Sequence, residues 1–125
     1  MKLRIAAGLL LVMAPLASAA AAMPVSTFLA KAESLKRKGP LAMFSSDLKL
    51  LMNQVKADAG ELKAENQAAA AAGRRKAYCT PPSGAEMGTK EVLQAMQAVP
   101  VAQRARTSTK DALRAYFARR FPCKA

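Results

Sequence analysis

The chain has 125 residues and a formal net charge of +12, from 20 lysines and arginines against eight acidic residues, and it contains no histidine. The length suits one domain. Without histidine, and with its acidic residues spread singly, the chain lacks the base–nucleophile sets of hydrolases, and two cysteines alone are a poor ligand set for zinc. We therefore expect no enzyme activity, no metal and no cofactor.

The first 22 residues have the three parts of a secretory signal peptide. A positively charged start precedes an apolar run, and Ala17-Ser18-Ala19 has the small-x-small pattern of a cleavage site. The apolar run is shorter than the roughly 20 residues of a membrane-spanning helix, so we expect no membrane span, an uncleaved anchor being the alternative. Cleavage after Ala19 or Ala22 would leave a periplasmic protein with a single helical domain over residues 23–125.

Residues 25–38 have the pattern of a first helix. Apolar side chains recur at three- and four-residue spacing, Ser26 suits the N-cap, and three cations before Gly39-Pro40 suit its end. The apolar segment 41–44 that follows is expected to pack against the core.

A second helix should begin near Ser45 or Ser46 and carry its acidic residues on a solvated face. Its apolar stripe consists of Leu48, Leu51, Met52, Val55, Ala59 and Leu62. The alanines at 68–72 favour a continuing helix because alanine has the highest helix propensity, and Gly73 is a natural stop.

Two prolines and two glycines make residues 79–88 a loop. Thr89 is expected to cap a third helix that ends near Val99, and Ser108 a fourth that ends near Phe121. Their short connection predicts an antiparallel hairpin. The expected fold class is all-α, a small four-helix domain with a disulfide-closed C-terminal antiparallel helical hairpin.

The two cysteines, Cys79 and Cys123, are expected to pair, because an even cysteine count in an exported chain favours a disulfide. They flank the predicted hairpin, whose topology brings its two ends together. Closing a loop of about 45 residues stabilises the fold by about 4 kcal/mol. A metal-binding pair and a reactive thiol are the alternatives.

The segment from 78 to 123 has a characteristic frame. Tyr78-Cys79 precedes a Pro- and Gly-containing loop, Val99-Pro100 precedes Gln103-Arg104, and the chain closes in Phe121-Pro122-Cys123. This frame resembles the Rap/Tai immunity proteins, which protect bacteria against type VI secretion amidase effectors. The resemblance implies an exported, disulfide-bonded helical protein, often a homodimer, that binds and blocks a peptidoglycan-cleaving amidase.

Our first functional hypothesis is thus an exported protein that acts by occluding a protein partner. The candidate contact residues lie in two segments next to rigid elements: Pro81, Pro82, Met87, Arg104 and Arg106. One alternative is a periplasmic stress chaperone of the Hde-like type, and another is a basic structural protein on anionic envelope surfaces. Export argues against nucleic acid as the partner despite the basic charge.

Overall fold

The computed structural model describes residues 22–84 and 86–124, so the predicted signal peptide lies outside the described residues up to residue 21. The described part of the chain has four α-helices and no β-strand, which confirms the predicted all-α class. The elements are α1 (Val25–Lys38), η1 (Gly39–Phe44), α2 (Ser46–Ala71), α3 (Thr89–Gln97), η2 (Val101–Gln103) and α4 (Thr109–Arg120), where η marks a 3-10 helix.

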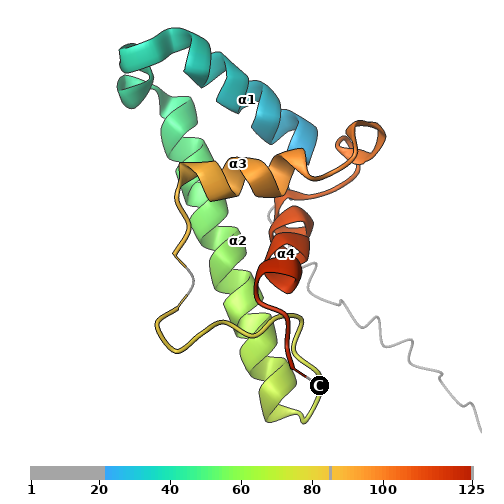
Figure 1. Ribbon diagram of the computed structural model, residues 1–125. Helices are drawn as coiled ribbons and strands as arrows, with labels where there is room; N and C mark the ends of the chain where they lie inside the picture. Colours follow the sequence, from blue (N-terminus) through green and yellow to red (C-terminus); the bar gives the residue numbers. More distant parts are fainter. Residues whose placement is uncertain (1–21, 85, 125) are drawn as a thin grey trace, which may run out of the picture.

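The core lies between the four α-helices, with α1 and α4 in contact with each other. α1 and α4 each pack against α2 and α3. Figure 1 shows α1 and α2 joined by η1 at one end of the molecule, far from the C-terminus. The largest fully buried side chains are Leu62, Met96, Leu113, Val25 and Thr109.

The starts of α2 and α4 follow the predicted capping chemistry. The Ser45 hydroxyl accepts a hydrogen bond from the Asp47 N–H (3.3 Å), and the Ser108 hydroxyl accepts one from the Asp111 N–H (3.0 Å). At α3 the prediction is one residue off, because Gly88 occupies the N-cap position and Thr89 is the first helical residue.

α1 begins differently from the prediction, because carbonyls of a distant segment accept hydrogen bonds from the N–H groups of its first turn. The Val25 N–H donates to the Thr107 carbonyl (2.8 Å), and the Ser26 N–H donates to the Arg104 carbonyl (3.0 Å). The Ser26 side chain is exposed, and no side chain caps the helix. The prediction of Ser26 as N-cap is wrong, since carbonyls from the turn before α4 take that role.

The buried face of α2 includes a carboxylate. Asp58 is only 4% exposed. Its carboxylate accepts hydrogen bonds from the Thr109 hydroxyl (2.6 Å) and from the Gln54 amide (2.9 Å). Met52, expected in the buried stripe, is 51% exposed. The core-facing positions of α2 repeat at three- and four-residue spacing and include Asp58. The prediction that Met52 is buried is therefore wrong, and so is the prediction that the acidic residues of this helix all face solvent.

The alanine-rich end of α2 is helical, as its propensity predicts. The helix continues through Ala71, and Gly73 follows with a φ of 68°. A positive φ at this point is the usual glycine termination of a helix.

The η1 segment is not packed into the core, contrary to expectation. Leu41 is 71% exposed, Met43 78% and Phe44 89%, and only Ala42 packs against the core. η1 contacts mainly α1 and α2, whose ends it joins. The turn formed by η1 lies beyond the ends of α3 and α4, so no element within the described residues covers these side chains.

Candidate functional site

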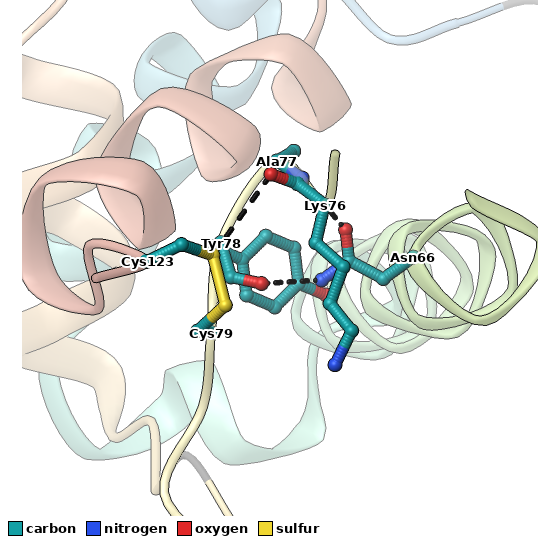
Figure 2. The surroundings of a disulfide bond; sticks show 6 residues. All are labelled: Asn66, Lys76, Ala77, Tyr78, Cys79 and Cys123. Carbon is teal, nitrogen blue, oxygen red and sulfur yellow. Dashed lines mark hydrogen bonds between the residues drawn. A yellow bond between two sulfur atoms is a disulfide. The ribbon is translucent and has the colours of Figure 1, made fainter. Parts of the chain in front are cut away.

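Three segments that are distant in the sequence meet beside the disulfide. Cys79 and Cys123 are bonded, as predicted, with their Cα atoms 4.9 Å apart. The Cys79 N–H donates to the Phe121 carbonyl (2.8 Å), which fixes the start of the 79–88 loop to the end of α4. Figure 2 shows Asn66 of α2 reaching the same segment. Its side-chain amide donates to the Tyr78 carbonyl (2.8 Å) and accepts from the Ala77 N–H (3.0 Å).

Tyr78 adds an apolar anchor at the same place. It is 6% exposed, and its ring lies 4.9 Å from that of Phe117, measured between centroids. Burial raises the pKa of Tyr78, and the nearby negative charge of Glu65 raises it further. The ring therefore stays neutral and packed at physiological pH. The start of the loop after Cys79 is thus fixed by a covalent bond, hydrogen bonds and an aromatic contact.

The outer edge of the α2–α4 contact carries a network of ion pairs. Lys110 lies 2.9 Å from Glu61 and also pairs with Glu65, while Arg114 lies 3.0 Å from Glu65 and also pairs with Asp111. The hydrogen bonds from Lys110 and Arg114 lower the pKa of Glu65. Hydrogen bonds to the same glutamates raise the pKa of Lys110. These carboxylates bind α4, whereas the sequence indicated a solvated face.

Beside the anchored loop lies an open cleft of about 570 Å³. It is lined by Ser83, Gly84, Glu86, Met87, Lys90, Glu91, Gln94, Tyr116, Arg120 and Phe121. Met87, Tyr116 and Phe121 supply its apolar surface, and each packs in part against the core. Arg120 is exposed at the rim, with its guanidinium carbon 5.9 Å from the centroid of the Phe121 ring. We call this feature the loop cleft.

A second, smaller cleft of about 200 Å³ lies on the η2 side of α4. Its lining includes Pro100, Gln103, Thr107 and Arg119. It has no aromatic lining residue, so it offers less apolar contact area than the loop cleft.

The structure brings only one of the five predicted contact residues into the loop cleft. Met87 lines it, whereas Pro81 and Pro82 are exposed on the loop outside its lining. Arg106 is exposed as predicted. Arg104 is half-buried, and its guanidinium donates to the carbonyls of Val99 (2.8 Å) and Gln97 (3.0 Å) at the end of α3.

Arg104 therefore has a structural role that the sequence did not reveal. The cations at a helix C-terminus bind the unpaired carbonyls there. Because its backbone carbonyl also accepts from the Ser26 N–H, this residue joins the start of α1 to the end of α3. Alanine at Arg104 is consequently unsuited as a variant that tests partner binding alone.

Nine of the ten lining residues of the loop cleft were not among the predicted contact residues, and three of them, Tyr116, Arg120 and Phe121, lie on α4 or directly after it. Helical spacing places Tyr116 on the apolar face of α4, which is typical of a core residue, and the side chain is half-buried in the structure. An aromatic side chain with one covered and one open face cannot be told from a core residue by helical spacing alone. The cluster of aromatic residues and arginines from 116 to 121 was the available signal.

No group of three or more histidine, cysteine, aspartate or glutamate side chains suited to a metal occurs within residues 22–84 and 86–124. In the same residues, every helix is too short or too polar to cross a membrane. Comparisons with protein-family models, with curated proteins and with solved structures find no significant match to this chain.

Proposed function

We propose that this chain is an exported, non-enzymatic binding protein of the Rap/Tai type, which binds and blocks a peptidoglycan amidase effector of type VI secretion in the periplasm. The observation that carries the proposal is the loop cleft beside the disulfide-anchored loop. Every residue that lines it lies between 83 and 121, within the segment 78–123 that carries the resemblance. A disulfide is also typical of proteins outside the cytoplasm.

The lining of the loop cleft suits a protein partner. Protein interfaces are enriched in tyrosine, phenylalanine, methionine and arginine, and their energetically dominant residues lie in partly enclosed hollows. Met87, Tyr116, Phe121 and Arg120 form such a set. The disulfide and the Cys79 N–H bond fix the base of the loop, which reduces the ordering cost of binding there.

The test is inhibition of an amidase effector from the same genome by the purified mature protein. Peptidoglycan hydrolysis is measured with increasing amounts of the protein, and binding is measured by calorimetry. We expect hydrolysis to stop near one equivalent. An amidase that neither binds nor is inhibited would overturn the proposed function.

Two neighbouring arginines of α4 provide a matched pair for locating the contact. Arg120 lies at the loop cleft and Arg119 at the second cleft, and both are exposed. Arg120→Glu is expected to weaken binding at least about tenfold, because it reverses a rim charge, while Arg119→Glu leaves binding unchanged. Equal effects of both variants would contradict the loop cleft as the contact surface. Arg106→Glu tests the remaining predicted contact in the same assay.

The resemblance also implies a homodimer, which we retain as a proposal. Light scattering of the mature protein across a range of concentrations measures the mass in solution directly. Acid titration separates the chaperone alternative, since an Hde-like protein would suppress the aggregation of other proteins at low pH.

A further inference from the structure

The exposed apolar side chains of the molecule gather at one end. Five of the six large hydrophobic residues that are exposed among the described residues lie between Leu41 and Met52, and the sixth is Val101. We call Leu41, Met43 and Phe44 of η1 the tip; it lies at the turn between α1 and α2 in Figure 1. Contiguous exposed apolar surface is rare on soluble proteins and marks an interaction site.

Polar contacts between the end of α1 and the start of α2 fix the conformation of the turn that carries the tip. Lys31 of α1 pairs with Asp47 of α2 (3.0 Å), and the Lys38 ammonium donates to the Ser45 hydroxyl (3.5 Å). The Ser45 N–H donates to the Ala42 carbonyl (3.0 Å). These contacts brace the two helix ends and leave the apolar side chains projecting into solvent.

Cations surround the tip. Lys36, Arg37 and Lys38 are exposed in the last turn of α1, and Lys49 is exposed near the start of α2. The single acidic residue between positions 36 and 52 is Asp47, which is already paired with a lysine. The tip therefore combines projecting apolar groups with a local excess of positive charge.

We propose that the tip docks the protein on an anionic phospholipid surface. Phe44, Met43 and Leu41 would enter the boundary between headgroups and acyl chains, while the flanking cations bind lipid phosphates. Phospholipid is favoured over an acidic protein because the tip projects from a turn and lines neither cleft. Fluid lipid accepts projecting side chains of any shape, whereas a protein partner would have to supply a matching hollow. This docking is separate from the loop cleft and does not depend on the proposed function.

The apolar part of the proposal can be tested with a single fluorescent reporter, since the chain contains no tryptophan. Phe44→Trp places the reporter at the tip, and Val101→Trp places it at a similarly exposed apolar position elsewhere. Each mature variant is mixed with phosphatidylcholine vesicles prepared with and without phosphatidylglycerol. We expect a blue shift, and quenching by brominated acyl chains, for Phe44→Trp with phosphatidylglycerol only. No shift, or the same shift for Val101→Trp, would overturn the proposal.

The charge part is tested with two basic triplets of equal size. The tip variant combines Lys36→Gln, Arg37→Gln and Lys38→Gln, which removes the three cations beside the tip. The control variant combines Arg74→Gln, Arg75→Gln and Lys76→Gln, which removes the exposed triplet beyond α2. Each cation near an anionic membrane strengthens binding about fivefold, so the tip variant should bind roughly a hundredfold more weakly in cosedimentation. The second triplet should change binding little. Equal losses would show attraction by net charge alone and would overturn the proposal, as would undiminished binding to pure phosphatidylcholine.

Discussion

The buried hydrogen bond between Asp58 and Thr109 should contribute substantially to stability, because it joins α2 to the first residue of α4 away from water. Thr109→Val keeps the shape of the side chain and removes the hydroxyl, which leaves one oxygen of a buried carboxylate without its donor. A hydrogen bond to a charged group contributes about 1.5–3 kcal/mol. We therefore expect the free energy of unfolding to fall by about 2–3 kcal/mol, which corresponds to a Tm lower by about 10–20 °C in a domain of this size.

A double-mutant cycle separates this interaction from the other effects of each substitution. Urea unfolding of the mature protein is followed by circular dichroism for Thr109→Val, Asp58→Leu and the double variant. The double variant should be more stable than the sum of the two single effects predicts, by about 1–3 kcal/mol, because neither polar group is left alone. The exposed Thr27→Val is the control, with an expected change below about 0.5 kcal/mol. Additive single effects would refute the assigned coupling.

Three further predictions concern stability. Gly39→Ala should destabilise the protein by about 1–2 kcal/mol, because Gly39 has a φ of 57°. Gly60→Ala, inside α2, should stabilise it by up to about 1 kcal/mol, because a Cβ there meets nothing within 4 Å. Urea midpoints that shift in the same direction for both variants would contradict this. The lowered pKa of Glu65 means that its ion pairs stabilise the fold above about pH 4.5 and are lost as the pH falls through the lowered value. Glu65→Gln should therefore reduce the loss of stability on acidification, by less than about 1 kcal/mol because the carboxylate is half-exposed. The measurement is the urea midpoint at neutral and at acidic pH. A pH dependence equal to that of the unchanged protein would argue against these pairs. Replacing Cys79 and Cys123 by serine should lower the free energy of unfolding by about 4 kcal/mol, and reduction of the native protein should reproduce this loss; a reduced protein with an unchanged midpoint would disprove it.

The helices and the disulfide could be predicted because their signals are local. Ser45 and Ser108 as caps and glycine after α2 each act within a few residues and agree with the structure, and the apolar spacing predicted the helices themselves, although it misplaced Met52. The cysteine pairing followed from the cysteine count, the expected export and the position of Cys79 and Cys123 on either side of α3 and α4.

The features that could not be predicted depend on contacts between distant segments. Ser26 does not cap α1 because the helix already begins at Val25, where carbonyls some eighty positions later accept from the Val25 and Ser26 N–H groups. Asp58 is buried because Thr109 supplies a donor at the start of another helix. Phe44 is exposed because no later helix extends over η1, and helical spacing contains no information on this. The loop cleft likewise exists only once the loop is folded beside α4.

The closure of α1 by the turn before α4 sets an order for folding. The N–H groups of Val25 and Ser26 gain their acceptors only when residues 104–107 are in place, so the start of the first helix depends on the last part of the chain. The partner of Cys79 lies later still, at Cys123. If the chain is exported as proposed, with its N-terminus crossing first, the fold could be completed only after nearly the whole chain has crossed the membrane.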